Sequence, residues 1–160
     1  LHFTKEILKQ LKANGVLVEY ITLHVTYNTF KPIENDDYTL HDIGSEYCFI
    51  KENLMNKIIK VKDNNKKIIA VGTTVTRALE NYASKSLSGD YSGEVDLFIT
   101  PGYKFKIIDS LITNFHLPQS TLLLLVASLT GRETLLNLYK NAIEHKYRFY
   151  SYGDSMFIRS

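Results

Sequence analysis

Hydrophobic and polar positions along the chain predict helices that alternate with strands. Several helices begin or end at a recognisable capping signal. Thr4 is suited to cap the first helix, which Gly15 would stop. Ser120 is suited to cap a strongly apolar helix that stops at Gly131, and a further helix is expected over about 133–145, where apolar residues recur at helical spacing.

Segments rich in β-branched and aromatic residues predict strands. The predicted strands cover residues 16–27, 46–50, 67–71, 95–99, 105–109, 147–152 and 156–158. Two more helices are expected, one over about 54–61 and one directly after Gly72. The polar stretch 28–45 and the Ser/Gly-rich stretch 84–93 are expected to be loops. Because strands and helices alternate, the pattern predicts the α/β class, with a mixed sheet flanked by helices.

Composition narrows the class of protein. A chain of 160 residues with 44% hydrophobic content can bury the core of one globular domain, and 22% charged residues argue against a disordered tail. The net charge of +2 neither requires nor excludes a nucleic-acid partner. The single cysteine, Cys48, cannot form an internal disulfide and indicates the cytoplasm. The longest apolar run, residues 122–127, is too short to span a membrane.

Five segments are denser in polar and aromatic side chains than a plain fold requires. In the first, His24 lies in a predicted strand, where a histidine is more often structural than catalytic. In the second, His41 lies close to the carboxylates of Asp42 and Glu46. That grouping suits acid–base chemistry, and it equally suits a solvated loop that enters a strand.

The third segment joins a predicted strand to a helix through Gly72, Thr73 and Thr74, with Arg77 one turn later. Backbone N–H groups at a helix start, flanked by hydroxyls, can bind an anion such as a phosphate or a carboxylate. The alternative is that Thr73 or Thr74 only caps the helix. No glycine-rich dinucleotide or Walker signature is present, so this segment alone does not predict nucleotide binding.

The fourth segment places Asn114 and His116 on a constrained connection before a capped helix. Pro118 restricts Leu117 to an extended conformation, and ligand-binding residues often occupy such connections. A plain strand-to-helix connection with Ser120 as its cap is the alternative, and it leaves His116 unexplained.

The fifth segment interleaves Tyr147, Phe149 and Tyr152 with Arg148, and Asp154 follows. Aromatic rings beside a positive charge suit the binding of bases and phosphates. An amphipathic edge strand is the alternative reading of this composition.

Together, these segments resemble one known family. The matching strings are LHFT (1–4), HVxxxTF (24–30), HxxxSEY (41–47), IAVGTTVTRALE (69–80), DLFITPGY (96–103), LITNFHLPQSTLLLLVASLTG (111–131) and YRFYSYGDSMFI (147–158). They are similar to the S-adenosylmethionine:tRNA ribosyltransferase-isomerases of queuosine biosynthesis, and they cover nearly the whole chain. The family usually has glycines in the HVxxxTF turn. This chain has Thr26 and Asn28 there, so we expect its backbone to differ locally.

The resemblance implies an activity. Family members move the ribosyl portion of S-adenosylmethionine onto 7-aminomethyl-7-deazaguanine at the wobble position of tRNA. They rearrange it to the epoxycyclopentane of epoxyqueuosine and release adenine and methionine. S-adenosylmethionine is then a ribosyl donor, tRNA is the partner, and neither a metal nor a membrane is expected. The alternatives are a non-catalytic α/β module that binds a nucleotide or RNA, and a methyltransferase, which the lack of a glycine-rich loop disfavours.

The resemblance also implies that residues 1–160 are the C-terminal part of the family's larger α/β catalytic domain. The family's N-terminal half, with an inserted β-barrel domain, is absent. The chain starts at Leu1 rather than at methionine and ends at Ser160, directly after an apolar stretch. We therefore expect it to be part of a longer protein and to be inactive alone.

Roles follow for residues in the matching motifs. The candidates for proton transfer are His24, His41, Glu46, His116 and Asp154. The candidates for binding S-adenosylmethionine are Gly72, Thr73, Thr74, Arg77 and Asn114. The candidates for binding tRNA are Tyr147, Arg148, Phe149 and Tyr152. Among the histidines, we expect His116 to contribute most to turnover, because Pro118 and Ser120 fix its backbone and the ordinary pKa of histidine is near neutral.

Overall fold

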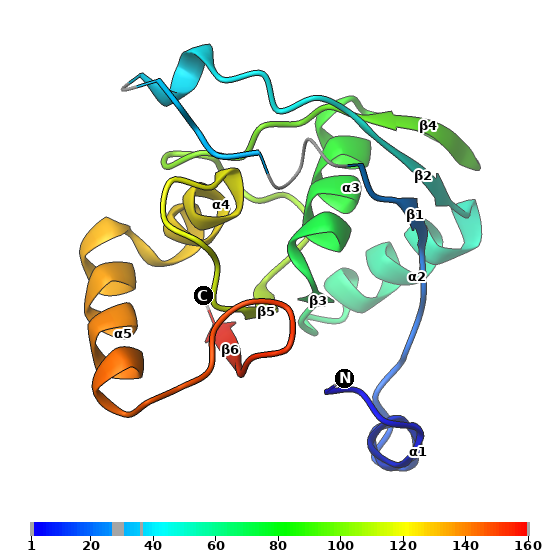
Figure 1. The fold of residues 1–160 in the computed structure, drawn as a ribbon. Helices are drawn as coiled ribbons and strands as arrows, with labels where there is room; N and C mark the ends of the chain where they lie inside the picture. The colour runs from blue at the N-terminus through cyan, green and yellow to red at the C-terminus, as the bar shows by residue number, and fades with distance from the viewer. Residues whose placement is uncertain (1, 27–30, 36, 160) are drawn as a thin grey trace.

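The chain folds as two small β-sheets with helices between and around them (Figure 1). The computed structural model describes residues 2–26, 31–35 and 37–159. The strands are β1 (Thr22–His24), β2 (Glu46–Ile50), β3 (Ile69–Val71), β4 (Tyr91–Val95), β5 (Ser110–Asn114) and β6 (Ser155–Arg159). The helices are α1 (Lys5–Ala13), the 3-10 turn η2 (Tyr38–Leu40), α2 (Glu52–Asp63), α3 (Thr73–Ser84), α4 (Thr121–Thr130) and α5 (Arg132–Glu144).

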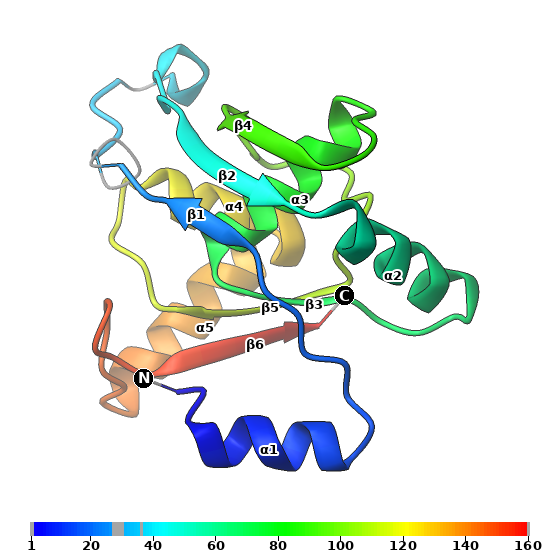
Figure 2. The same cartoon turned by 90° about the vertical axis from the view of Figure 1, so that its right-hand side faces the viewer.

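The first sheet has the strand order β1-β2-β4 and is antiparallel. The second has the order β3-β5-β6 and is mixed, because β5 pairs with β3 in parallel and with β6 antiparallel. Figure 2 shows α3 and α4 in a layer between the two sheets, with α1 beyond the second sheet. The predicted α/β class is confirmed. One mixed sheet was predicted, and the structure has a mixed sheet, β3-β5-β6, together with a separate antiparallel sheet.

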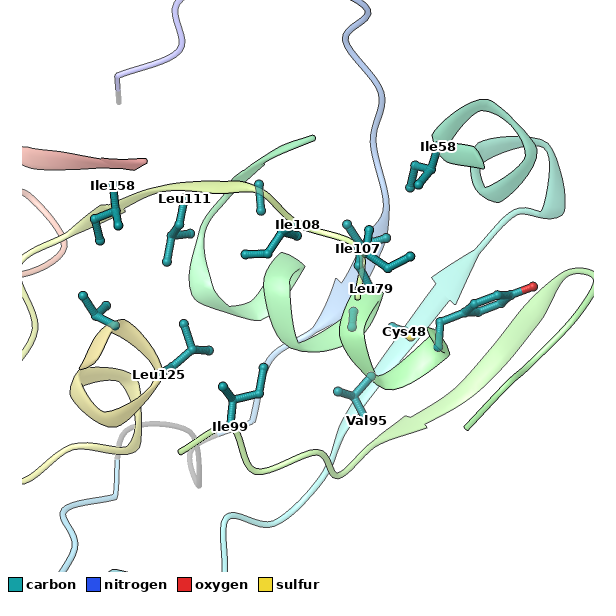
Figure 3. Close-up of a cluster of buried hydrophobic side chains, with 14 of the residues drawn as sticks. Cys48, Ile58, Leu79, Val95, Ile99, Ile107, Ile108, Leu111, Leu125 and Ile158 are labelled. Carbon is teal, nitrogen blue, oxygen red and sulfur yellow. The ribbon is translucent and has the colours of Figure 1, made fainter. Parts of the chain in front are cut away.

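The core fills both sides of α3 (Figure 3). Cys48 and Val95 from the first sheet and Leu111 from the second face the central helices, where Leu79 and Leu125 meet them. Burial alternates along β2, as expected for a strand with one face on the core. Each large apolar side chain that is fully buried contributes roughly 1.5–3 kcal/mol to stability.

The predicted helix signals are confirmed. The Thr4 hydroxyl accepts a hydrogen bond from the N–H of Ile7 at 3.2 Å at the start of α1. The Ser120 hydroxyl accepts one from the N–H of Leu123, also at 3.2 Å, at the start of α4. Gly131 ends α4 with a φ of 79°, a conformation that favours glycine.

The long strand predicted at 16–27 is wrong except for β1. Leu17 and Tyr20 are exposed, and within the described residues the strand pairing of this segment is confined to Thr22–His24, which pairs with β2. β-Branched and aromatic composition favours an extended chain, but a strand forms only where a partner supplies hydrogen bonds. The described residues before β1 form a connection outside the sheet, in which Val18 and Ile21 are half-buried.

The strand predicted at 95–99 is wrong, because β4 lies earlier and ends at Val95. The Arg77 side chain donates hydrogen bonds to the carbonyls of Leu97 and Val95, at 3.2 and 3.4 Å respectively. Val95 is the last residue that pairs with β2, opposite Glu46, and the next carbonyl that Arg77 binds, that of Leu97, lies beyond the end of the strand.

The strand predicted at 105–109 is also wrong, because β5 begins later, at Ser110. The buried Glu80 carboxylate accepts hydrogen bonds from the backbone N–H groups of residues 106–108, at 2.8, 2.9 and 3.0 Å. The Tyr103 hydroxyl donates a further hydrogen bond to it at 3.1 Å. The donors that a strand would have used are therefore taken by one side chain.

The strand predicted at 147–152 is wrong because the segment closes into a loop. The N–H of Asp154 donates to the carbonyl of Arg148 at 2.8 Å, and the N–H of Gly153 donates to that of Tyr150 at 2.9 Å. A Cβ atom on Gly153 would lie 2.3 Å from the Arg148 carbonyl oxygen, so this close approach requires glycine. Strand β6 follows directly, close to its predicted position.

Candidate active site

The carboxyl ends of β3 and β5 lie side by side at one edge of the second sheet. Val71 pairs with Ile112 in the parallel ladder, and the N–H of Gly72 donates to the carbonyl of Ile112 at 2.8 Å. In open α/β sheets, ligands bind beyond the carboxyl ends of the strands. This edge carries the start of α3 after β3, and Asn114 and His116 at the end of β5. We call it the β3–β5 edge.

The start of α3 points uncapped backbone donors toward this edge. Gly72 is the N-cap, with a φ of 97°, and the described residues show no side-chain cap hydrogen bond at this helix start. The alternative that Thr73 or Thr74 caps the helix is therefore wrong. Unpaired N–H groups and the positive end of the helix dipole attract anions. The arrangement fits the predicted carboxylate site, with Thr73 buried and Thr74 half-buried beside it.

His116 is held from two elements. Its Nε2 lies 2.9 Å from the hydroxyl oxygen of Thr113 on β5, and its backbone N–H donates to the Tyr139 hydroxyl on α5 at 2.7 Å. Burial lowers the pKa of His116 to about 4, so the ring is neutral at pH 7. The pKa of His116 therefore lies below the ordinary near-neutral value of histidine on which its predicted role was based. Thr113 and Tyr139 were not predicted, although Thr113 lies inside the TNFHLP string.

Three strings that are far apart in the sequence meet at the Gly153 carbonyl, close to Asn114. The Asn114 side-chain amide donates to the carbonyl of Asp154 at 3.2 Å and more weakly to that of Gly153 at 3.5 Å. Nε2 of His2 lies 2.9 Å from the same Gly153 carbonyl. Asn114 thus joins β5 to the loop before β6, and its amide is oriented by that loop.

The Asp154 carboxylate closes this loop. Its two oxygens accept hydrogen bonds from the backbone N–H of Arg148 at 2.8 Å and from the Arg148 guanidinium at 3.1 Å. The backbone bond, followed by the side-chain bond, lowers the pKa of Asp154. A carboxylate stabilised in its charged form is a weak base, so the geometry favours a structural role for Asp154.

The predicted tRNA-binding residues divide into two groups. The Phe149 ring packs on Phe115 with 4.8 Å between ring centroids, so it belongs to the local packing. Tyr152 is 83% exposed, Tyr147 is exposed, and the Arg148 side chain is 73% exposed. The second group therefore offers a surface with two accessible rings and a guanidinium.

Glu46 and Arg77 lie away from the β3–β5 edge, inside the core. Their side chains are 1% and 2% exposed, and Oε2 of Glu46 lies 3.3 Å from Nη1 of Arg77. Burial lowers the pKa of Arg77, and the Glu46 charge opposes that shift. Neither group reaches a ligand unless the core opens. The predicted roles in proton transfer and in anion binding do not fit these positions.

Of the other two candidate histidines, one lies on the first sheet and one lies in the loop before β2. His24 is exposed on β1, with its ring centroid 5.9 Å from that of Phe49. His41 is half-buried after η2, with its ring centroid 6.3 Å from that of Phe98. Its Nε2 atom is buried and has no hydrogen-bond partner among the described residues. Within the described part of the chain, no hydrogen bond or ring contact joins either histidine to His116.

The long polar loop before β2 reaches the connection that carries His116. The backbone N–H of Ile33 donates to the carbonyl of Gln119 at 2.7 Å. Thr26 is tied to Ser45 by a hydrogen bond from its hydroxyl to the Ser45 carbonyl at 3.2 Å. Residues 27–30 lie outside the described residues, so the expected local difference at Asn28 stays a prediction.

Two negative findings apply to the described ranges only. Within them, no three His, Cys, Asp or Glu side chains group together as potential metal ligands. Also within them, no single helix has the length and apolar character needed to cross a membrane. Helices α4 and α5 meet that criterion only as a pair, and this pair is bent by 110°.

Comparison with known proteins identifies the family. Residues 1–158 match the family described as queuosine biosynthesis protein. The S-adenosylmethionine:tRNA ribosyltransferase-isomerase of Sulfurihydrogenibium sp. (strain YO3AOP1) is 51% identical over 158 residues, which are 99% of this chain and 46% of that protein. The protein of the same name from Acetivibrio thermocellus is 50% identical over 160 residues, 99% of this chain and 47% of that protein.

A solved structure agrees with this assignment. The crystal structure of S-adenosylmethionine tRNA ribosyltransferase from Thermotoga maritima is 37% identical, with a TM-score of 0.83 over 98% of this chain and 50% of that one. The chain spans about half the length of the curated relatives it matches. These matches confirm the resemblance seen in the sequence motifs, and the chain belongs to the queuosine biosynthesis protein family.

Proposed function

We propose that the full-length protein transfers and isomerises the ribosyl portion of S-adenosylmethionine onto 7-aminomethyl-7-deazaguanine at the tRNA wobble position. The product is epoxyqueuosine-tRNA, and adenine and methionine leave. By full-length protein we mean a polypeptide of the relatives' length that contains this chain as its C-terminal half, working in the cytoplasm. The supporting observation is 51% identity, over 99% of the chain, to a relative that carries the name of this reaction.

The β3–β5 edge is where we place S-adenosylmethionine. The uncapped start of α3 suits the methionyl carboxylate, because Gly72, Thr73 and Thr74 present backbone N–H groups there. Asn114 and His116 lie on the neighbouring strand end and can orient the rest of the molecule. Arg77 takes no part in this site, because its guanidinium is enclosed in the core.

His116 is the best-placed of the five proton-transfer candidates. The reaction requires a base that removes a proton next to the sulfonium, and departing adenine requires a proton or a hydrogen bond on a ring nitrogen. Glu46 and Asp154 are held in ion pairs with arginines. His24 lies on the other sheet, and His41 lies in the loop before β2. Only His116 combines a position at the β3–β5 edge with a side chain outside any ion pair.

The loop before β6 is where we place tRNA contacts. Tyr147 and Tyr152 offer exposed rings for stacking, and Arg148 offers a charge for phosphate. Asn114 bonds to the backbone of this loop, so a contact with tRNA would lie next to the ribosyl donor.

The test is a product assay. Full-length protein is incubated with S-adenosylmethionine and a tRNA that carries 7-aminomethyl-7-deazaguanine. We expect equal amounts of adenine and methionine, and a nucleoside with the mass of epoxyqueuosine. S-adenosylhomocysteine would instead indicate a methyltransferase, and binding without turnover would indicate a non-catalytic module. The 160-residue chain alone should show no turnover, and adenine release near the full-length rate would contradict that expectation.

A further inference from the structure

Thr113 and His116 share a hydrogen bond whose direction determines what His116 can do. We propose that the Thr113 hydroxyl holds His116 in the tautomer protonated at Nδ1, so that the ring presents a neutral N–H donor, and not a base, to the ligand. Only the identity of the ligand rests on the proposed function. The tautomer itself follows from the hydrogen bonds of the described residues.

The Thr113 hydroxyl is buried beside the His116 ring. Thr113 is 6% exposed, and its hydroxyl oxygen lies 2.9 Å from Nε2 of His116. Among the described residues, the Thr113 hydroxyl has no other hydrogen-bond partner. A hydroxyl carries one hydrogen, and buried polar hydrogens are almost always bonded to an acceptor.

The two tautomers differ in whether that hydrogen is satisfied. If Nε2 carried the proton, it would donate to the Thr113 oxygen, and the Thr113 hydrogen would have no acceptor. If Nε2 is bare, the Thr113 hydroxyl donates to it and one bond satisfies both groups. A neutral imidazole has one protonated nitrogen, so the proton then lies on Nδ1.

Nδ1, the other ring nitrogen of His116, is the atom that we expect to bind the ligand. In the described part of the chain, Nδ1 of His116 has no hydrogen-bond partner, and His116 as a whole is half-buried, so we take Nδ1 as the atom that meets the ligand. The ring cannot turn freely, because Thr113 holds its side chain and Tyr139 holds its backbone N–H. Burial keeps the pKa of His116 at about 4, so this donor is uncharged at pH 7.

An uncharged donor defines the chemical class of its partner. Neutral histidines serve elsewhere as hydrogen-bond donors that polarise an uncharged acceptor. The anionic end of the donor substrate has the start of α3 available to it, which leaves His116 for a neutral acceptor. On the proposed function, that acceptor is a ring nitrogen of the leaving adenine, where a hydrogen bond would stabilise the departing electron pair. The base that removes the proton next to the sulfonium is then a different group.

The first experiment measures the tautomer without any substrate. Full-length protein labelled with ¹⁵N-histidine is studied by NMR, and the His116 signals are assigned by their loss in His116→Gln. We expect a protonated Nδ1 and an unprotonated Nε2 at pH 7. A protonated Nε2, or a mixture of both tautomers, would overturn the proposal. Because no ligand is present, this result does not depend on the proposed function.

The second experiment tests the role of Thr113. Thr113→Val removes the hydroxyl at nearly constant volume, so His116 should become a mixture of both tautomers. We expect kcat to fall about tenfold with KM little changed, because one hydrogen bond is lost. Thr113→Ser should restore both properties. Thr130→Val is the matched control, since its hydroxyl bonds to a carbonyl within α4, and it should change neither.

The possible results distinguish failure of the His116 tautomer proposal from failure of the proposed function. A Thr113→Val protein with native tautomer and native kcat would refute the role of Thr113. If that variant does not fold, the wild-type tautomer and the Thr113→Ser protein still decide the question. If the wild type shows the expected tautomer but releases no adenine from S-adenosylmethionine, the proposed function fails and the tautomer assignment stands.

Discussion

Polar residues on the two sheets differ in what surrounds them. Glu46 on the first sheet pairs with Arg77 of α3, and both side chains are enclosed by the core. Asn114 and His116 at the β3–β5 edge are half-buried, and each is bonded on one side by protein groups. Both sets come from motifs that are equally dense in polar residues.

The comparison shows that polar density in a sequence does not separate structural groups from ligand-binding groups. A buried charge requires partners on every side, because desolvation of a lone ion is costly. A binding group requires one open side and a support that holds it still. Glu80 belongs with the first kind, since its carboxylate is fully buried and accepts three backbone N–H groups and a phenol hydroxyl.

The largest effect is expected from breaking the enclosed pair. Arg77→Met leaves the Glu46 carboxylate in the core without its arginine, so the free energy of unfolding should fall by roughly 3–5 kcal/mol. Urea unfolding of the full-length protein measures this. The Glu46→Gln/Arg77→Met double variant should recover part of the loss, because the buried charge is gone. A loss below about 1 kcal/mol would instead return Arg77 to the ligand-binding candidates.

The next effect concerns turnover at the open edge. His116→Ala in the full-length protein should lower turnover about 10²-fold or more with little change in S-adenosylmethionine affinity, because a donor that acts mainly in the transition state is lost. His24→Ala and His41→Ala should lower it less, because His24 lies on the other sheet and His41 lies in the loop before β2. Near-normal turnover in His116→Ala, combined with a loss in either other variant, would move the site to the first sheet. Loss of thermal stability in all three would mark them as structural.

A smaller effect is expected from pH. Burial holds the pKa of folded His116 at about 4, below the ordinary value of about 6.5. The unfolded chain therefore binds a proton in this window that the folded chain does not, and acidification favours unfolding. From pH 7 to pH 5 this linkage should cost about 2 kcal/mol, which His116→Gln should remove from the pH dependence. Above pH 7, the free energies of unfolding of the wild type and His116→Gln should change with pH in the same way. If they still change in the same way between pH 7 and pH 5, the burial of this ring is contradicted.

The smallest effect on stability is expected at the exposed loop. The Arg148–Asp154 pair is 73% and 33% exposed at its two side chains, so Arg148→Ala should change the free energy of unfolding by under about 1 kcal/mol. Its tRNA affinity should fall more than its S-adenosylmethionine affinity. The slope of log affinity against log salt should decrease by about one, because one phosphate contact is lost. An unchanged slope with weaker S-adenosylmethionine binding would contradict the tRNA assignment.

The sequence by itself determined the elements with local signals and the family. Thr4 and Ser120 cap helices through hydrogen bonds to residues three positions away, and Gly131 stops α4 through its own φ angle. Such signals act within one helical turn, so a short window of sequence contains them. Long strings such as TNFHLPQST identify the family for a similar reason, because each motif lies within one short stretch of sequence.

Only the tertiary structure decided where the strands end and which polar residues remain open. Glu80 takes the backbone donors of residues 106–108, and Arg77 takes the carbonyls of Val95 and Leu97. The pKa of His116 likewise depends on how deeply the folded chain buries its ring. These properties arise from groups that are distant along the chain. No local pattern encodes them, because a hydrogen bond and a desolvation cost depend on position in space and not on spacing in sequence.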